Sequence, residues 1–386
     1  MTIRVLMLSH YYEAHGGGIE AVAARLAAGL AGRGLAVTWM AADADPPPPA
    51  VPGLQLRPMP AWNGVERRTG IPFPLWTPRA LRKLPDIVRA HDVLLVHDSL
   101  YTANLVGIAA ARLAGRPVLL VQHIGNVPYR NPLVHGLVRL GNATATRWAM
   151  AAARRVVFIS TAVQAWFTAR NPKLAAKAEF VPNGVDTATF TSGADADRLA
   201  ARTALGVKDG PLLLFVGRFV AKKGLPLLRQ LANLQPRCQF AFAGSGPLDP
   251  AAGCGANVRV LGTLTPAQLS AWYRAADYLL LPSFGEGFPL VVQEALACGL
   301  PTLVAEEVAA ACPDFGTGLH GLPVTGKADD VTMWNRALSA RLTEIPNSAT
   351  RATIAGRAAA LWSWDRTLDR YAALVRALAA GTGQLT

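Results

Sequence analysis

Short apolar runs alternate with Ala-rich stretches of helical spacing, and this pattern occurs twice along the 386 residues. Each apolar run is short and bounded by turn residues, so it predicts a buried strand rather than a helix. Strands that alternate with helices build parallel sheets with helices on both faces. At roughly 100–200 residues per domain, a chain of this length predicts two such α/β domains.

The predicted elements divide into two sets. The first set has strands at Ile3–Ser9, Ala36–Ala41, Val93–His97, Val118–Gln122 and Val156–Ile159, with a helix at Gly18–Gly32. The second has strands at Leu212–Val216, Gln239–Ala243, Val258–Leu261, Tyr278–Leu281 and Thr302–Val304, with helices at Asp195–Leu205, Leu225–Leu234, Pro266–Ala276 and Val291–Ala297. Residues 45–60 are Pro-rich and predict a stiff extended loop. Residues 363–380 have the spacing of a final amphipathic helix.

Targeting and redox signals are few. The N-terminal apolar run is too short for a signal peptide, and no run of about 20 residues lacks charges and turn signals, so no membrane-spanning helix is predicted. The four cysteines show no C-x-x-C pairing. They suit a reducing cytoplasm and argue against a zinc site or a disulfide framework. We therefore expect a cytoplasmic protein.

The formal net charge of +13 is uneven. Residues 1–190 hold 20 Lys+Arg and 10 Asp+Glu, a net of +10, whereas residues 191–386 hold 18 and 15, a net of +3. A basic first half favours an anionic partner such as a phosphate or a lipid headgroup. No zinc-finger spacing and no aromatic RNA-binding motif is present, so a nucleic-acid partner is not expected.

The segment 281–301 is the strongest motif. A strand ends at Leu281, a Gly-rich loop follows, and a helix opens near Leu290. Backbone N–H groups at such a helix start can bind an anion. Glu286 and Glu294 lie about two helical turns apart, so both could face one crevice. On spacing alone, a plain strand-to-helix turn with two solvated glutamates explains the segment equally well.

Two further segments carry candidate phosphate contacts. Arg218 and Lys223 follow a predicted strand, and an arginine fork with a lysine point charge suits phosphate oxygens, although surface charge at a strand end is the simpler alternative. Gly16-Gly17-Gly18 follows the first strand but lacks the G-x-G-x-x-G spacing of dinucleotide-binding enzymes. Because Asp43 follows the second strand, an oxidoreductase remains an alternative for this half.

Histidines also occur at predicted strand ends, where parallel sheets line a ligand crevice. His123 ends one such strand, and His10 and His97 end two others. A lone histidine is more often structural, and we expect that role for His10 and His97.

Together the motifs resemble, in order and over nearly the whole chain, the signature of glycosyltransferase family 4. The matching segments are the glycine loop Gly16–Gly18, His123, Pro182–Asp186, Gly217-Arg218 with Lys223-Gly224, Gly244–Pro247, the Glu286-to-Glu294 region and Trp362–Trp364. The resemblance implies a GT-B fold, in which two Rossmann-like α/β domains face each other across an interdomain cleft. The N-terminal, acceptor-side domain would be 1–188 plus 363–386, because the last helix crosses back onto it. The donor-binding domain would be 189–362.

The resemblance also implies a retaining transfer of a hexosyl group from a nucleotide-diphosphate sugar, without a metal or other cofactor. Arg218 and Lys223 would neutralise the donor diphosphate, Glu286 would position the sugar hydroxyls, Glu294 would hold the ribose, and His123 would contact the sugar. The further donor-binding residues implied are Gly16, Gly17, Gly18, Gly217, Gly244, Gly287, Phe288, Pro289 and Leu290. An epimerase or phosphorylase of similar architecture, and a non-catalytic nucleotide-sugar-binding subunit, are the alternatives.

The acceptor side is suggested by composition. Residues 57–89 hold seven Lys+Arg, two acids and the aromatic residues Trp62, Phe73 and Trp76. Basic and aromatic residues together suit an anionic membrane surface. We therefore expect peripheral attachment and a lipid-linked or cell-envelope glycan precursor as acceptor, which would place the protein in polysaccharide synthesis. A solvated positive face over buried aromatics is an equal alternative.

Overall fold

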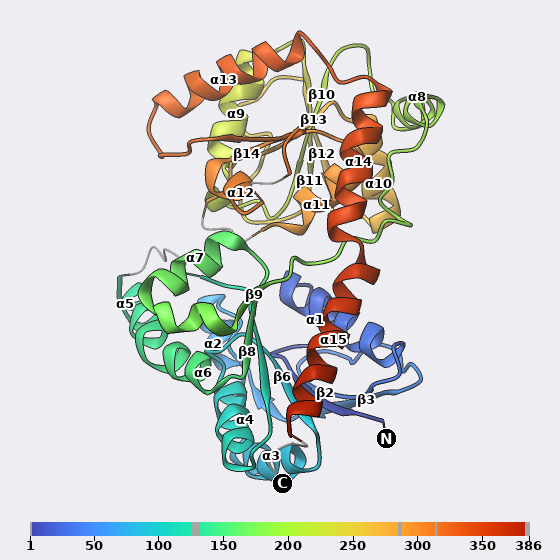
Figure 1. The fold of residues 1–386 in the computed structure, drawn as a ribbon. Coiled ribbons are helices and arrows are strands. Elements are labelled where there is room, and N and C mark those ends of the chain that lie inside the picture. The colour runs from blue at the N-terminus through green and yellow to red at the C-terminus, as the bar shows by residue number, and fades with distance from the viewer. Residues whose placement is uncertain (1, 126–131, 285–287, 313–314, 383–386) are drawn as a thin grey trace. The chain divides into compact units, whose positions relative to one another are not determined.

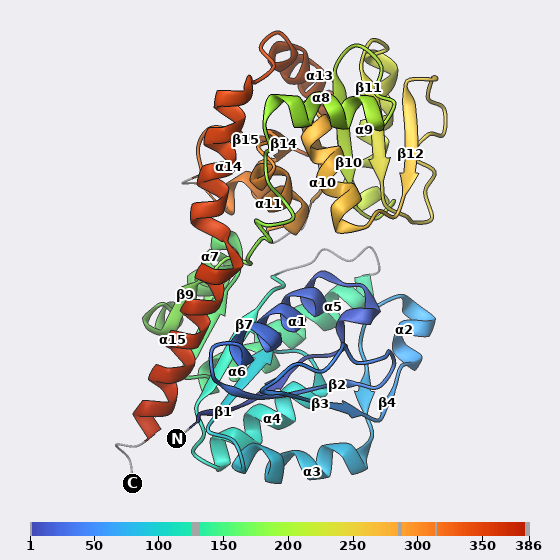
Figure 2. The same ribbon diagram turned by 90° about the vertical axis from the view of Figure 1, so that its right-hand side faces the viewer.

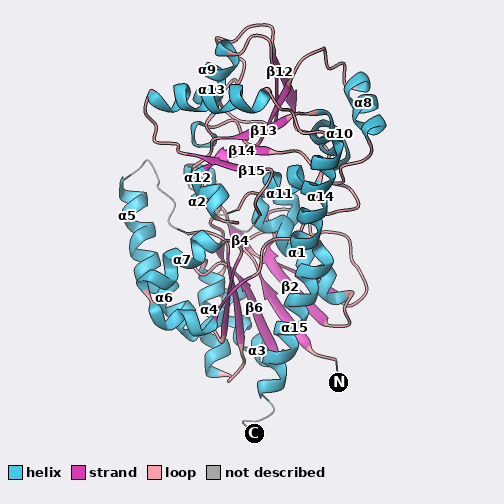
Figure 3. Ribbon diagram, turned by 45° about the horizontal axis from the view of Figure 1, so that its top comes forward, coloured by secondary structure: helices cyan, strands magenta, loops and turns pink. Residues whose placement is uncertain are grey.

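The computed structural model describes residues 2–125, 132–284, 288–312 and 315–382. The chain divides into two compact units: unit 1 is Met1–Gly184 with Asp365–Thr386, and unit 2 is Val185–Trp364. The boundaries expected from the sequence, after 188 and at 363, fall within a few residues of these. Each unit contains a parallel sheet with helices on both faces (Figure 3).

Within the described residues, unit 1 contains a seven-stranded sheet in the order β3-β2-β1-β6-β7-β8-β9. The strands are β1 (Arg4–Leu8), β2 (Ala36–Ala42), β3 (Leu54–Met59), β6 (Val93–His97), β7 (Val118–Gln122), β8 (Arg155–Phe158) and β9 (Ala178–Phe180). Every neighbouring pair is parallel. The central strands β6 and β7 are apolar except at their last residue, because helices cover both of their faces.

The helices of unit 1 are α1 (Gly18–Ala31), α2 (Gly64–Thr69), α3 (Pro78–Arg89), α4 (Thr102–Leu113), α5 (Pro132–Gly141), α6 (Arg147–Ala152), α7 (Thr161–Arg170) and α15 (Trp364–Thr382). A small antiparallel pair, β4 (Ala61–Trp62) and β5 (Leu75–Trp76), flanks α2. The red helix α15 lies beside the blue helix α1 (Figure 1), where Leu368 packs so closely on Gly29 that a Cβ there would meet it at 2.4 Å.

Within the described residues, unit 2 contains a six-stranded parallel sheet in the order β12-β11-β10-β13-β14-β15. The strands are β10 (Leu212–Val216), β11 (Gln239–Ala243), β12 (Val258–Gly262), β13 (Tyr278–Leu281), β14 (Thr302–Ala305) and β15 (Leu319–Leu322). The helices are α8 (Asp195–Ala204), α9 (Leu225–Leu234), α10 (Pro266–Ala275), α11 (Leu290–Ala297), α12 (Glu306–Ala310), α13 (Asp329–Leu342) and α14 (Ser348–Trp362). Figure 2 shows these elements from the side.

The predicted strands and helices are confirmed, most of them to within one residue. The prediction of a loop throughout 45–60 was wrong, because β3 occupies Leu54–Met59 and pairs with β2. Pro58 made this strand hard to predict, because proline has no N–H to donate to a sheet hydrogen bond. It is tolerated here because β3 is an edge strand, where one side of the backbone needs no partner.

The chain passes between the units twice, and the two passages are joined within unit 2. Val185 N–H donates to the carbonyl of Trp362 at 2.6 Å, and Trp364 N–H donates to the carbonyl of Val185 at 3.3 Å. The Trp362 ring stacks on Phe315 at 4.8 Å in the core of unit 2. The Trp362–Trp364 segment is therefore a structural clasp between the first and last residues of this unit.

Candidate active-site residues at the carboxyl ends of both sheets

In unit 2, the loops after β10 and β11 are packed backbone against backbone. A Cβ at Gly244 would lie 2.0 Å from the carbonyl oxygen of Gly217, and Phe219 N–H donates to the carbonyl of Ser245 at 2.8 Å. Gly244 also has a φ of +136°, which side chains other than glycine rarely adopt. The predicted glycines Gly217 and Gly244 thus have a clear structural purpose, which is to fit two loops together at the sheet edge.

This packing positions the predicted cations. Arg218 follows Gly217 directly and is exposed, and Lys223 ends a short 3-10 turn, Ala221–Lys223, before α9. The loop after β13 joins the same group, since Phe284 N–H donates to the carbonyl of Lys222 at 3.2 Å. Three loops from neighbouring strands therefore meet at the carboxyl edge of this sheet, where parallel α/β sheets bind ligands.

Glu294 lies on α11 and is held by a buried tyrosine. The Tyr273 hydroxyl donates to Glu294 Oε2 at 3.1 Å. Burial raises the pKa of Glu294 to about 7, and the hydrogen bond from Tyr273 lowers it only in part. The carboxyl group therefore changes charge near neutral pH, and as a carboxylate it only accepts hydrogen bonds.

The remaining predicted residues of this motif have different positions in the structure. Phe288 is buried and packs edge-on against Trp362 at 5.2 Å, so its side chain belongs to the core. Pro289 is the N-cap of α11, and Leu290 is its first residue. Glu286 and Gly287 lie outside the described residues.

In unit 1, the predicted glycine loop adjoins a buried contact between a histidine and a carboxylate. Gly17 is the N-cap of α1, and a Cβ there would lie 2.0 Å from the Glu20 carboxylate. Glu20 Oε1 lies 2.8 Å from His10 Nε2, and both side chains are almost fully buried. Burial raises the Glu20 pKa, but the hydrogen bond and electrostatic attraction of His10, the backbone N–H of Glu20 and nearby His15 together outweigh it, so the pKa is lowered. Gly16 and Gly18 border open space.

His123 is buried and paired with another histidine. His97 Nδ1 lies 2.9 Å from His123 Nε2. Burial lowers the pKa of His123 to about 3 and that of His97 well below its usual value, with nearby histidines adding to both shifts. Both rings are therefore neutral at physiological pH, and the tautomer of one fixes that of the other.

Asp98, which directly follows β6, is a further candidate site residue that no sequence motif indicated. Its Oδ1 accepts hydrogen bonds from the N–H groups of His123 at 3.0 Å and Ile124 at 3.3 Å. Burial raises its pKa to about 6, against the lowering effect of these bonds. Asp98 has a φ of +61°, and Asn104 stabilises this backbone by donating to the carbonyls of His97 and Asp98. An acidic residue directly after a buried strand was the signal available in the sequence.

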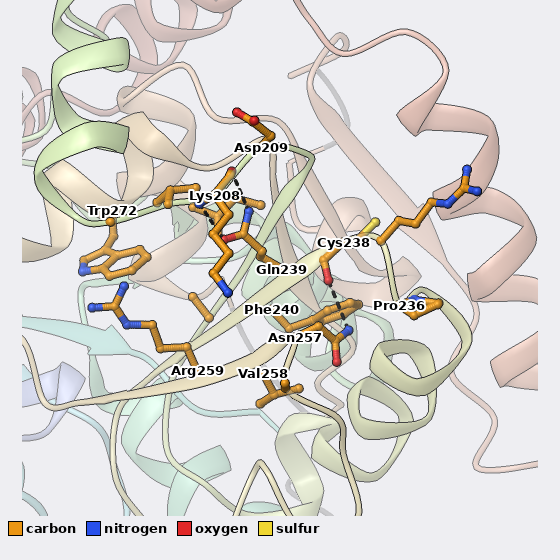
Figure 4. Close-up of a pocket in the computed structure, with 16 residues that line it drawn as sticks. Lys208, Asp209, Pro236, Cys238, Gln239, Phe240, Asn257, Val258, Arg259 and Trp272 are labelled. Carbon is orange, nitrogen blue, oxygen red and sulfur yellow. Dashed lines mark hydrogen bonds between the residues drawn. The ribbon is translucent and has the colours of Figure 1, made fainter.

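A cavity of about 510 Å³ opens at the opposite, amino edge of the unit 2 sheet. Two of its polar side chains make hydrogen bonds to backbone groups (Figure 4). Gln239 accepts from the N–H of Lys208 and donates to its carbonyl, and Asn257 donates to three carbonyls. Arg259 lies over the Trp272 ring at 5.2 Å. None of the predicted site residues lines this cavity, and we assign its polar groups to stability.

Two family models match consecutive parts of the chain. The model described as Glycosyltransferase Family 4 matches residues 16–189, and the model described as Glycosyl transferases group 1 matches residues 210–344. Together they span both units and include every described site residue.

Curated relatives match over part of their length. A D-inositol 3-phosphate glycosyltransferase from Mycolicibacterium vanbaalenii is 36% identical over 234 residues, which are 54% of this chain and 48% of the relative. One of the same name from Geodermatophilus obscurus is 38% identical over 221 residues, 52% of this chain and 47% of the relative. The matches thus span about half the length of these relatives.

Solved structures match over nearly the whole chain. Sucrose-phosphate synthase from Thermosynechococcus elongatus has a TM-score of 0.71 at 21% identity, covering 98% of this chain and 100% of that one. Anabaena HepE, solved with UDP and glucose, has a TM-score of 0.72 at 18% identity, covering 97% and 99%. The lipopolysaccharide glycosyltransferase WaaG has 0.64 at 20% identity, covering 96% and 99%.

These likenesses agree with the two parallel α/β sheets and with the motifs at their carboxyl edges. The chain therefore belongs to the group 1 glycosyltransferases of family 4, which have the GT-B fold.

Proposed function

We propose that this protein transfers a hexosyl group from a nucleotide-diphosphate sugar to an acceptor with retention of anomeric configuration. The observation that carries the proposal is the carboxyl edge of the unit 2 sheet. There the Gly217–Gly244 contact positions Arg218, Lys223 follows in the next turn, and Glu294 is half-buried on the helix that begins after β13. A nucleoside diphosphate requires cations for its phosphates and a carboxylate that accepts hydrogen bonds from its ribose hydroxyls.

In this proposal the protein stabilises the departing diphosphate. Negative charge grows on the diphosphate as the sugar–oxygen bond breaks, so Arg218 and Lys223 interact more strongly in the transition state than in the ground state. The leaving diphosphate accepts the proton of the acceptor hydroxyl on the same face of the sugar. Glu294 accepts hydrogen bonds from the ribose hydroxyls. Glu286, which lies outside the described residues, is assigned to the sugar hydroxyls by resemblance alone.

His123 is proposed to act as a neutral hydrogen-bonding group near the sugar. Its pKa of about 3 makes it a poor proton acceptor at neutral pH. Because His97 and Asp98 hold its ring and its backbone, its contribution would be orientation of the sugar.

We also propose that the reaction needs no metal ion, with Arg218 and Lys223 neutralising the diphosphate. Within the described residues, no group of three or more His, Cys, Asp or Glu side chains is arranged to hold a metal ion. Transfer measured with and without EDTA tests this part of the proposal directly, since a metal-dependent enzyme would lose activity.

The acceptor is proposed to be anionic, either lipid-linked or a cell-envelope precursor. Unit 1 carries most of the excess positive charge, and the relatives named above are named for a phosphorylated acceptor. In the region 57–89, Trp62 is 45% exposed with Arg68 over its ring at 5.8 Å, whereas Trp76 is 4% exposed and belongs to the core. The exposed Trp62 supports peripheral membrane attachment through this region, and the buried Trp76 contributes nothing to it.

The structure contains, in its described part, no helix of sufficient length and apolarity to cross a bilayer. We propose a cytoplasmic location because Cys238, Cys254, Cys298 and Cys312 are free thiols, which suit a reducing compartment. Sedimentation with anionic vesicles at low salt tests the peripheral attachment, and the absence of binding would exclude it.

The donor is tested first by thermal shift with UDP, GDP and ADP and their sugars. A ligand that binds only the folded state raises the melting temperature. UDP is the leading candidate because a similar structure contains it. Transfer is then measured with the stabilising sugar nucleotide and phosphorylated acceptors. Release of an altered sugar without any acceptor would instead favour the epimerase or phosphorylase alternative, and binding without turnover would favour a non-catalytic subunit.

A further inference from the structure

A groove of about 670 Å³ in unit 1 is lined by residues of α5, α6, α7 and the turns beside them. We call it the α5–α7 groove. Met150, Phe167 and Leu174 line it and are almost fully buried, so its floor is apolar. It shares no residue with the site assigned to the sugar nucleotide.

The α5–α7 groove is strongly cationic. Arg139, Arg147 and Arg170 line it, and among the residues that the structure describes no acidic one does. This imbalance extends through the sequence, since no Asp or Glu occurs between Asp98 and Glu179. Arg170 lies over the Trp166 ring at 4.1 Å and also donates to the Trp166 carbonyl, so one of the three cations is held in place. A concave surface with a single sign of charge attracts counter-ions strongly.

A buried polar group in the groove has an unused donor. Asn142 lines the groove and is 7% exposed. Its Oδ1 accepts a hydrogen bond from Thr146 at 3.2 Å, and Thr146 in turn accepts one from Ser99 at 2.9 Å. Its Nδ2 has no partner among the residues that the structure describes. Buried donors are nearly always paired in native proteins, so an unpaired one needs an explanation.

The backbone at this point is also unusual. Asn142–Thr146 forms a turn of π-helix between α5 and α6. Such turns are rare and occur frequently at functional sites. Thus two features meet in the groove: excess arginine, and an unpaired buried amide carried by a π-helical turn.

We propose that the α5–α7 groove binds an anionic amphiphile, with a phosphate monoester at the arginines and an alkyl chain on the apolar floor. Arginine matches phosphate oxygens with paired donors, and Asn142 Nδ2 supplies one more. Leu140, which is 60% exposed, supplies apolar surface for the chain above the buried Met150 and Phe167. This site is independent of the donor site, and it differs from the 57–89 region because it takes a single lipid molecule.

The experiment is calorimetric titration of the full chain with dihexanoyl phosphatidic acid, which stays monomeric, alongside dihexanoyl phosphatidylcholine and inorganic phosphate. We expect the phosphatidic acid to bind at least about tenfold more tightly than either comparison ligand, because it alone satisfies both halves of the groove. Equal binding of phosphatidylcholine would overturn the anionic half of the proposal, and equal binding of inorganic phosphate would overturn the apolar half.

Variants locate the site. Arg139→Ala with Arg147→Ala, and separately Asn142→Asp, should each weaken phosphatidic acid binding by about tenfold or more, the second because a carboxylate would repel the phosphate. The control is Arg237→Ala with Arg336→Ala, which removes the same charge from exposed positions of unit 2 and should leave binding unchanged. Unaltered binding in both groove variants, or equal loss in the control, would overturn the assignment.

Asn142→Asp could also disturb the buried contact with Thr146, so thermal unfolding of each variant is measured alongside. The thermal shift produced by the donor nucleotide should persist in every groove variant. That result separates a failure of the lipid site from a failure of the proposed transferase site.

Discussion

The carboxyl edges of the two sheets have the same topology but opposite electrostatics. In unit 1, His10, Glu20, His97, Asp98 and His123 are buried and hydrogen-bonded to one another or to the backbone. In unit 2, Arg218 is exposed, and the loop that carries it is fixed by glycine contacts between backbones. Burial gives unit 1 side chains of fixed orientation, among them the neutral pair His97 and His123. Exposure gives unit 2 a cation that needs no partner and can meet a diphosphate directly.

The largest expected effect follows from that exposed cation. Arg218→Ala should lower kcat by about 10²–10³, comparable with the loss of one transition-state donor, because the departing diphosphate loses a charge-assisted partner. The melting temperature should stay within a degree or two of wild type, since surface substitutions cost little. Lys222→Ala is the matched control and should change kcat by less than about threefold. Equal activity of the Arg218 variant and wild type would remove Arg218 from the site.

A glycine-to-alanine substitution should cost more folding stability in the loops of unit 2 than in the glycine loop of unit 1. Gly244→Ala should destabilise unit 2 by about 2–4 kcal/mol, because the new Cβ would overlap the Gly217 carbonyl. Gly16→Ala also introduces a side chain at positive φ, but nothing lies within 4 Å of it, so about 1 kcal/mol is expected. Urea denaturation of both variants measures the difference. Equal losses would mean that the close approach in unit 2 is relieved by loop movement.

Asp98 tests the cost of burying charge in unit 1. Its folded pKa of about 6 lies above the unfolded value, so between roughly pH 4 and 6 the folded state binds more protons. Its contribution to stability therefore falls as pH rises through that window, by roughly 3 kcal/mol at most. Asp98→Asn removes this term, so the variant should gain stability relative to wild type as pH rises. Parallel denaturation curves at pH 4 and pH 7 would show that Asp98 is not shifted.

The smallest effect concerns Glu294. If the carboxylate accepts ribose hydroxyl hydrogen bonds, donor nucleotide affinity should rise several-fold, and at most about tenfold, from pH 6 to pH 8 as Glu294 ionises near pH 7. Glu294→Gln keeps the shape and should lose this dependence, leaving only the titration of the nucleotide phosphate itself. Calorimetry at the two pH values compares them. A variant with the same pH slope as wild type would contradict the ribose assignment.

Central strands were predictable from the sequence, whereas the edge strands other than β12 were not. Val93–His97 is a continuous apolar run because helices cover both faces of the strand, and the prediction matches β6 at both ends. β3 was missed because one side of an edge strand faces away from the sheet, so Pro58 and exposed polar residues are tolerated there. The short edge strands β9 and β15 have similarly weak apolar patterns.

Candidate site residues could be predicted from the sequence where they lie together in one loop. Arg218 and Lys223 lie in a single short segment, so the sequence alone could suggest them as candidate phosphate contacts, a role that stays a prediction. Asp98 depends on partners distant in sequence, namely Asn104 for its backbone and the His123 N–H for its carboxylate. The pairing of His123 with His97 depends likewise on the neighbouring positions of β6 and β7 in the sheet. Such relations follow from topology, which a single motif does not contain.

The clasp between Val185 and Trp362–Trp364 has a consequence for biosynthesis. The first and last residues of unit 2 are neighbours, so this unit is an uninterrupted insertion into unit 1. Unit 1 lacks α15, and with it the contact of Leu368 on Gly29, until translation has passed all of unit 2. Because domains generally fold as units during synthesis, unit 2 should reach its native state on the ribosome before the sheet begun at Arg4 receives its last covering helix.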